Sequence, residues 1–265
     1  MLLLIDIGNT HTHLGVANSE RVLRQRNIST AAWSDSAGEA LLRKFVGKSN
    51  LVGMSSCSVV PRVTPLIKKA VKRLFHVRCL ELTHETVRGV GIDYRKPKTI
   101  GPDRLANAVA ARHHFGAPVV AVDFGTAVTL DVVDPTGNFI GGIIAPGLAA
   151  MTDYLHEKTA LLPRIRLREV AFSIGKSTEQ AMLVGALHGF CGLIHALITE
   201  LIRSLHYQNL PVVVTGGYAP LIAGKLSEIT AVEPLLTLEG LRLHWQFHRG
   251  DRRLACQPGK ELPKQ

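Results

Sequence analysis

Three segments of the chain have the hydrophobic pattern of a buried β-strand that ends in a glycine-rich turn. In each, a run of mostly aliphatic residues leads into a polar turn, which is typical of a buried strand followed by a tight turn. Two segments share a longer pattern of apolar strand, Asp, any residue, Gly and then a Thr, with Asp6 and Asp123 in the shared position. This repetition indicates an internal duplication. The three segments are LLLIDIGNT at 2–10, VVAVDFGTAVT at 119–129 and PVVVTGGYAP at 211–220.

The first two strands each lead into a second extended segment, so both halves are expected to begin with an antiparallel hairpin. The returning segments are THLGVAN at 12–18 and TLDVVD at 129–134, and in the second half a turn at 134–137 leads to a further strand, NFIGGII. Helical periodicity follows and precedes these strands, which together predict an α/β protein of two related halves. The helical stretches are 36–46, 63–74, 104–114, 179–205 and 238–247.

A boundary between the halves is expected near residues 116–118, directly before the second Asp-containing strand. We therefore predict a first domain at 1–116, a second domain at 117–247 and a basic C-terminal tail at 248–265. The closing helix at 238–247 could pack back across the first half. The two halves are expected to meet over a cleft, because no low-complexity linker separates them.

Charge and composition argue against nucleic-acid binding and against secretion. Lys and Arg number 31 against 21 Asp and Glu, a formal net charge of +10, but the basic residues are scattered except in the tail. Aromatic residues make up 5% of the chain and do not alternate with basic ones, so nucleic-acid binding is disfavoured. The 4 cysteines form no C-x-x-C pair, and the first residues lack a basic leader. These features favour a protein of the reducing cytoplasm.

One apolar segment, residues 181–199, contains no Asp, Glu, Lys or Arg and is long enough to span a bilayer. Gly185 and Gly189 form a GxxxG spacing within it, but it also contains His188 and His195. We interpret it as a helix of a soluble protein that is buried on all sides, with a subunit interface as one way of covering it, and expect no membrane association.

The two repeated turns carry the first candidate chemistry. A carboxylate at the end of a buried strand, followed by a turn rich in backbone N–H groups and a hydroxyl, can hold a hydrated Mg²⁺ and phosphate oxygens. A single turn of this kind is more often an Asp that caps the turn, but the duplication favours a nucleotide site gripped from two sides. Neither the Walker pattern nor GxGxxG is present. The turns comprise Asp6, Gly8, Asn9 and Thr10, then Asp123, Gly125, Thr126 and Thr129, with a third turn at Thr215, Gly216 and Gly217.

A second candidate site lies at the start of the helix at 104–114, where Asp103 and Arg104 follow Gly101 and Pro102. Asp103 could be a helix cap, or it could take a proton from a hydroxylated, anionic substrate, with Tyr94 nearby in sequence. Both interpretations stay open on the sequence.

Three further residues carry weaker signals. Thr178, at the start of the long apolar helix, is equally consistent with a cap and with a substrate contact. His11 and His13 face one side of a strand as metal ligands do, but no third ligand is evident, so surface histidines are favoured.

In combination, eight motifs resemble those of the type III pantothenate kinases, members of the superfamily of acetate kinase, sugar kinases, Hsp70 and actin. The resemblance covers residues 1–243 and leaves only the tail outside. The motifs are DIGNT from Asp6, Tyr94 followed by GPDR from Gly101, DFGTAVT from Asp123, GGIIAPG from Gly141, KTALLPRI from Lys158, IGKST from Ile174, TGGYAPLI from Thr215 and LTLEGLR from Leu236.

This resemblance implies two ribonuclease H-like domains of the actin-like ATPase type and a cytoplasmic homodimer. The implied reaction is the ATP-dependent phosphorylation of pantothenate at its 4′-hydroxyl, the first step of coenzyme A synthesis. A catalytically inactive nucleotide-binding regulator of the same fold is the alternative. An inactive descendant has no reason to keep Asp6, Asp103 and Asp123 together, which favours the enzyme.

The resemblance also implies roles for single residues. Asp6 lies near Mg²⁺, Asp123 coordinates the monovalent cation, K⁺ or NH₄⁺, and Asp103 accepts the proton of the pantothenate hydroxyl. Arg104 is expected to keep Asp103 ionised, with a low pKa. The implied ATP contacts are Asp6, Ile7, Gly8, Asn9, Thr10, His11, Thr12, His13, Thr126, Gly216 and Gly217, and the implied pantothenate contacts are Tyr94, Gly101, Pro102, Asp103, Arg104 and Thr178.

Overall fold

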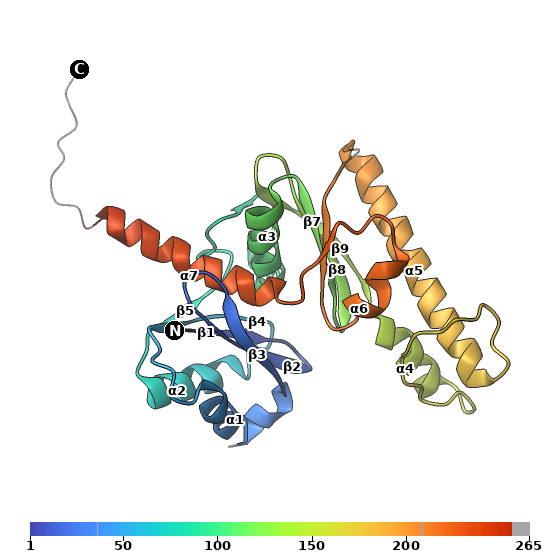
Figure 1. Ribbon diagram of the computed structural model, residues 1–265, viewed down its shortest axis with the longest axis horizontal. Coiled ribbons are helices and arrows are strands. Elements are labelled where there is room, and N and C mark those ends of the chain that lie inside the picture. Colours follow the sequence, from blue (N-terminus) through green and yellow to red (C-terminus); the bar gives the residue numbers. More distant parts are fainter. Residues whose placement is uncertain (36, 208, 256–265) are drawn as a thin grey trace. The chain divides into compact units, whose positions relative to one another are not determined.

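The computed structural model describes residues 1–35, 37–207 and 209–255, which form two compact units (Figure 1). Unit 1 comprises Met1–His113 together with the segment that starts at Thr237, and unit 2 comprises His114–Leu236. Each unit is built on its own β-sheet.

The sheet of unit 1 has the strand order β3-β2-β1-β4-β5. Its first two strands form the predicted hairpin, since β1 pairs antiparallel with β2, and β4 then pairs parallel with β1 and β5 parallel with β4. The strands are β1 (Leu2–Ile7), β2 (His11–Ala17), β3 (Val22–Ser29), β4 (Gly53–Ser58) and β5 (Cys79–Glu81).

Helices cover both faces of this sheet. Leu3, Ile5 and Ile7 of β1 pack in one core with α1 and α2, so the alternate residues Leu4 and Asp6 face the other side. There α7 packs closely, because a Cβ on Gly53 would lie 2.0 Å from the Trp245 ring. The helices of unit 1 are α1 (Ala37–Val46), α2 (Thr64–Phe75), α3 (Pro102–Phe115) and α7 (Leu236–Ala255), with the short elements η1 (Thr30–Ser34), β6 (Gly91–Ile92) and η2 (Pro97–Thr99).

Unit 2 repeats the same topology. β7 pairs antiparallel with β8 and parallel with β10, while β9 and β11 extend the sheet at β8 and β10. Phe124 of β7 meets Phe190 of the long helix α5 edge to face in the core, with ring centroids 6.0 Å apart. The elements are β7 (Val119–Phe124), β8 (Ala127–Val133), β9 (Asn138–Pro146), α4 (Leu148–Lys158), α5 (Thr178–Leu205), β10 (Val212–Thr215), α6 (Ala219–Ile222), η3 (Ala223–Lys225) and β11 (Ala231–Val232).

The predicted duplication is confirmed by the strand pairing, because Asp6 and Asp123 occupy the same position in the two sheets. Each is the last residue but one of its strand, and each lies in the first strand of an antiparallel hairpin. Asp6 is paired with His13, and Asp123 is paired with Thr129. The turn of the second hairpin is shorter by one residue, so Thr129 corresponds in position to His13.

Two predicted boundaries at the C-terminal end differ from the structure. The second domain was expected to extend to residue 247, whereas the chain from Thr237 belongs to unit 1. The reason is that the apolar side of α7 packs on unit 1. This agrees with the prediction that the closing helix could pack back across the first half. Residues 248–255 continue α7 and are not a tail, because no proline lies between Leu236 and Pro258 to end the helix earlier. Residues 256–265 lie outside the described residues.

The predicted long apolar helix is confirmed as α5, but it is not buried on all sides. Met182, Phe190 and Ile194 face the core of unit 2, whereas Gly185 and Gly189 are exposed in the single chain. Within the described residues it is the one helix that could cross a membrane by length and composition, and 39% of its most apolar window is buried. Such a helix is weak evidence for a membrane span, because core helices of soluble proteins pass the same test.

His244 of α7 makes the stability of unit 1 depend on pH. It is fully buried, and this burial, with His248 and Arg88 nearby, lowers its pKa to about 3. An unfolded imidazole titrates near pH 6.5, so neutral His244 stabilises the fold in full above that pH and its contribution is lost as the pH falls towards 3. Each pH unit below 6.5 should lower the free energy of unfolding by about 1.4 kcal/mol through this residue.

Urea denaturation of the wild type and of His244→Phe, near neutral pH and about one unit below 6.5, measures this contribution. The variant keeps an aromatic ring but cannot be protonated, so it should lose less stability on acidification. An equal loss in both proteins would contradict the assignment to His244.

Candidate active site

The hairpin of β1 and β2 has a turn held by its own backbone and by η1. The amide of Gly8 donates to the carbonyl of His11 (3.0 Å), and a Cβ on Gly8 would approach that same oxygen. Thr30 of η1 donates its hydroxyl to the carbonyl of Gly8 (2.7 Å) and its amide to the carbonyl of Thr10 (3.0 Å). Asn9, Thr10 and His11 are exposed at the tip. A fixed turn with exposed polar groups suits an anionic ligand.

The carboxylate of Asp6 lies at the base of this turn and is 9% exposed. Cys57 of β4 donates its thiol to Asp6 Oδ1 (3.3 Å), and His13 Nδ1 lies 3.6 Å from Asp6 Oδ2. Both neighbours are paired with Asp6 in the sheet, one on each side. Asp6 is therefore the middle member of a row of three side chains across β2, β1 and β4.

The histidines of the hairpin differ from the surface histidines that we expected. Both lie on one side, with ring centroids 6.4 Å apart, and His11 is exposed as predicted. His13, however, is half-buried, and burial together with His11 lowers its pKa. Among the described residues no group of three or more His, Cys, Asp or Glu side chains is arranged to hold a metal ion by itself.

Asp103 lies in the first turn of α3, where its Oδ1 accepts the amide of Arg104 (2.9 Å). A Cβ on Gly101 would come within 2.4 Å of that oxygen, so glycine is required there for the carboxylate to take this position. The helix begins at Pro102, so Asp103 is its second residue and does not hold the N-cap position.

The expectation of a low pKa for Asp103 is wrong. Burial raises the pKa of Asp103, and this effect outweighs the hydrogen bond from the Arg104 amide and the charge of Arg104, both of which lower it. Arg104 is itself buried, while Tyr94 is half-buried in the loop that precedes η2. The sequence could show that Arg104 adjoins Asp103, but not how deeply the carboxylate is buried.

Asp103 and Asp6 share a neighbour in Cys57. Burial raises the pKa of the Cys57 thiol well above its usual value, and the negative charges of Asp6 and Asp103 raise it further. Both carboxylates therefore lie within electrostatic range of one thiol in unit 1. Nothing in the sequence indicates that Cys57 lies beside Asp6, and the pairing of β4 with β1 is what places it there.

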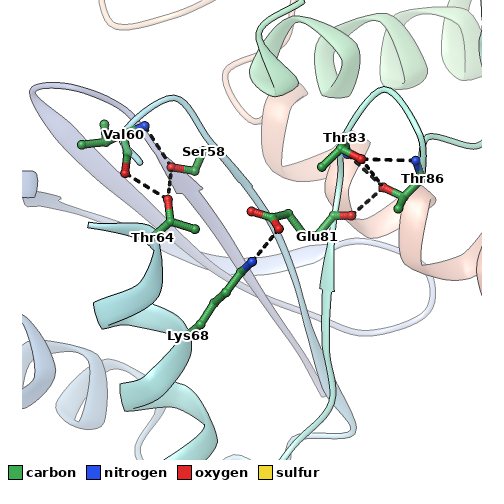
Figure 2. A network of polar contacts seen from close by, with 7 residues as sticks. All are labelled: Ser58, Val60, Thr64, Lys68, Glu81, Thr83 and Thr86. Carbon is green, nitrogen blue, oxygen red and sulfur yellow. Dashed lines mark hydrogen bonds and ion pairs between the residues drawn. The ribbon is translucent and has the colours of Figure 1, made fainter. Parts of the chain in front are cut away.

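The turn after β4 is tied down by side-chain hydroxyls (Figure 2). Thr64 of α2 donates to Ser58 Oγ (2.6 Å), and Ser58 accepts the amide of Val60 (3.0 Å). Lys68 of α2 pairs with Glu81 of β5, and the carbonyl of Glu81 accepts the hydroxyl of Thr86 (2.6 Å). The end of β4, next to Cys57, is thus held by α2, and α2 is joined to β5 by the ion pair of Lys68 and Glu81.

The second hairpin places Asp123 beside the Gly216–Gly217 turn that follows β10. Gly216 has a φ of +94°, and a Cβ there would lie 2.5 Å from Asp123 Oδ1. Thr129, opposite Asp123, donates its hydroxyl to the fully buried Asp131 (3.1 Å). Thr126 is exposed at the turn, and a Cβ on Gly147 would lie 2.4 Å from its carbonyl oxygen. The structure therefore brings Asp123, Thr126 and Gly216 together in unit 2.

Thr178 is not the cap of α5, because Ser177 is the N-cap and accepts the amide of Gln180 (3.3 Å). Thr178 instead lines an apolar cavity of about 500 Å³ between α4 and α5. Sequence reasoning did not predict α4 or this cavity. The cavity is lined by Met151, Thr152, Leu155, Leu162, Thr178, Ala181, Met182, Gly185 and Ala186.

Solved structures support the predicted fold class of two ribonuclease H-like, actin-like domains. The ethanolamine utilization protein EutJ from Carboxydothermus hydrogenoformans is similar with a TM-score of 0.54 and 17% identity, over 91% of this chain and 89% of that one. MreB 5 of Spiroplasma citri, solved with AMPPNP, has a TM-score of 0.53 and 9% identity, over 96% of this chain and 98% of that one. At these identities the likeness shows the fold alone.

Sequence comparisons identify the family. A family model described as type III pantothenate kinase matches residues 2–200. A protein of that name from Methylacidiphilum infernorum is 40% identical over 243 residues, which cover 91% of this chain and 87% of the relative. Another, from Akkermansia muciniphila, is 43% identical over 241 residues, which cover 91% of this chain and 96% of the relative. The chain therefore belongs to the type III pantothenate kinase family.

Proposed function

We propose that this chain phosphorylates pantothenate at its 4′-hydroxyl with ATP, in the first step of coenzyme A synthesis. Its family and its relatives' names support this substrate. The observation that carries the chemistry is that two carboxylates of unit 1, the buried Asp6 and the half-buried Asp103, both lie within electrostatic range of Cys57. One carboxylate can serve the metal-bound phosphates, and the other can take the proton of the acceptor alcohol.

Asp103 is the proposed general base. A carboxylate whose pKa is raised by burial is a stronger proton acceptor than an exposed one, provided that it is still ionised at neutral pH. The Arg104 guanidinium favours the ionised form of Asp103 and can attract the carboxylate of pantothenate. Tyr94, Gly101 and Pro102 are proposed to bind the same substrate.

The hairpin of β1 and β2 is proposed to bind the phosphates of ATP through residues 6–13. Its turn is held by Thr30 and exposes polar groups, so phosphate binding requires little reorganisation. A nucleotide-bound Mg²⁺ takes most of its ligands from phosphates and water and needs only one or two carboxylates from the protein. Asp6 fits that requirement without a preformed cage. When bound, Mg²⁺ neutralises charge on the transferred phosphoryl group.

Asp123 is the proposed ligand of the monovalent cation, K⁺ or NH₄⁺. The carbonyl oxygens of Gly125 and Thr126 both lie close to Gly147, so oxygen donors gather at this turn, and carbonyl oxygens can replace the hydration shell of K⁺. We propose Thr126 as an ATP contact and Gly216 and Gly217 as adenosine contacts.

We also propose that the protein is a homodimer of the cytoplasm whose subunits meet through α5. A Cβ on Gly185 would meet no atom within 4 Å, and one on Gly189 would meet only Met151, at 3.8 Å, so this face of α5 leaves room for a second backbone. Thr178 at the start of α5 is proposed to contact pantothenate. Sedimentation velocity at micromolar concentration should give a dimer, and a monomer would contradict this assignment.

The reaction is tested by coupled ADP release from the purified protein with ATP and Mg²⁺. We expect ADP release that depends on pantothenate and on K⁺ or NH₄⁺, with 4′-phosphopantothenate as the product seen by mass spectrometry. Replacing K⁺ by Na⁺ should abolish most of the turnover. Nucleotide binding without any turnover of pantothenate would instead support the inactive regulator.

A further inference from the structure

Cys57 is a buried group beside the proposed phosphate-binding hairpin that the proposed reaction does not use. It is 0% exposed and faces the same side of the sheet as Asp6, its partner in the parallel pairing of β1 and β4. Its Sγ lies 3.3 Å from Asp6 Oδ1, within hydrogen-bonding distance for sulfur. Since Asp6 as a carboxylate can only accept, the thiol is the donor.

The thiol is well suited to act only as a donor. An ordinary cysteine thiol is neutral at pH 7, so Cys57 offers Asp6 an S–H group as donor. A thiolate beside Asp6 would repel the carboxylate, whereas a neutral S–H can donate to it.

The backbone that carries Cys57 is held on both sides. The strand is paired with β1 and β5, and the next residue, Ser58, is tied to Val60 and to Thr64 of α2 (Figure 2). A donor on such a fixed strand restricts the rotation of the Asp6 side chain, because turning Oδ1 away would break its hydrogen bond with the thiol and leave a buried donor without its acceptor.

We propose that Cys57 is a positioning residue for Asp6, whose thiol holds the carboxylate in the orientation that serves the metal-bound phosphates of the nucleotide. This rests on the proposed function, since Asp6 has that task only in a nucleotide-dependent enzyme. Partners that orient a metal-side carboxylate commonly change metal affinity or activity by 10- to 100-fold when removed. A thiol is a weak donor, so we expect about a tenfold effect.

The test compares four variants in the full-length protein. Cys57→Ala and Cys57→Val remove the donor, the first leaving a small space and the second filling it with a slightly larger apolar group, and Cys57→Ser restores an O–H donor. Cys79→Ala is the matched control, because Cys79 lies on the neighbouring strand β5 and its thiol faces the carbonyl of Val77 (3.8 Å). Folding of each variant is checked by its melting temperature.

The main readout is binding of ADP with and without Mn²⁺, measured by calorimetry, and it does not depend on turnover. Cys57→Ala and Cys57→Val should bind Mn²⁺-ADP about tenfold more weakly than the wild type, while metal-free ADP binds equally well. In the kinase assay the same variants should need about tenfold more Mg²⁺ for half-maximal rate. Cys57→Ser should restore both values, and Cys79→Ala should change neither.

Unchanged Mn²⁺-ADP affinity in a folded Cys57→Val would overturn the proposal, and so would an equal loss of metal-free ADP binding, because a merely structural role affects both. Should Cys57→Ala fail to fold, Cys57→Val and Cys57→Ser decide the outcome. Failure of the proposed function looks different. In that case the wild type itself does not turn over pantothenate, whereas the metal dependence of ADP binding still reports on Cys57.

Discussion

Asp103→Asn should lower the turnover of pantothenate at least a hundredfold while ADP binding stays at the wild-type level. The change removes the proton acceptor but keeps the shape of the side chain, and positioned general bases contribute about 10²- to 10⁴-fold. Because partial burial disfavours the charged form of Asp103, loss of that charge should not destabilise the protein, and the melting temperature should not fall. Steady-state kinetics, calorimetry with ADP and thermal denaturation separate these effects.

The pH profile gives a second measure of the same residue. Burial raises the pKa of Asp103, so at a given acidic pH more of it is protonated and inactive than an exposed Asp would be. The acid limb of kcat/KM should therefore fall with an apparent pKa above 3.8, and the limb should be absent from the residual activity of Asp103→Asn. Asp35→Asn is the control, because Asp35 is exposed and its Oδ1 accepts the amide of Ala37, which the side-chain oxygen of Asn can also accept. Turnover by Asp103→Asn at the wild-type rate would refute the assignment.

The two hairpins could be predicted because their signals are local. An aliphatic strand, an Asp and a glycine turn lie within ten residues in each half, so Asp6 and Asp123 emerge without knowledge of the fold. The signal for the start of α3, Gly101 followed by Pro102, is also contained in neighbouring residues. Helices α1, α2, α3 and α5 were found within a few residues of their observed bounds, because each has a sustained helical period.

The remaining features depend on contacts between distant parts of the chain. Cys57 reaches Asp6 across 51 positions of sequence, and nothing near Cys57 indicates that β4 pairs with β1. The edge strand β3 is exposed along most of its length and so lacks the hydrophobic pattern of a strand. The pKa of Asp103 reflects competition between burial and Arg104, and only a structure gives the degree of burial.

The contact of α7 with α3 provides the second large effect, because α3 carries Asp103. A Cβ on Gly240 would lie 2.0 Å from the carbonyl oxygen of Ala106, which is backbone and cannot rotate away. Near this contact Thr237 donates its hydroxyl to Asn107 Oδ1 (2.8 Å), so the two helices are fixed to each other by packing and by a hydrogen bond. Any side chain at position 240 must therefore separate α7 from α3.

Gly240→Ala should lower the free energy of unfolding by about 3 kcal/mol, in the upper range for overpacked sites, and the melting temperature by about 6 to 10 °C. The matched control is Gly224→Ala, since a Cβ on Gly224 meets no atom within 4 Å. Below its melting temperature, Gly240→Ala should also lose turnover, because the displaced helix carries the proposed base. If this variant had the same melting temperature as the wild type, α7 would not pack on α3 as closely as the distance from Gly240 to the carbonyl of Ala106 indicates. The attachment of the C-terminal helix to unit 1 would then have to be revised.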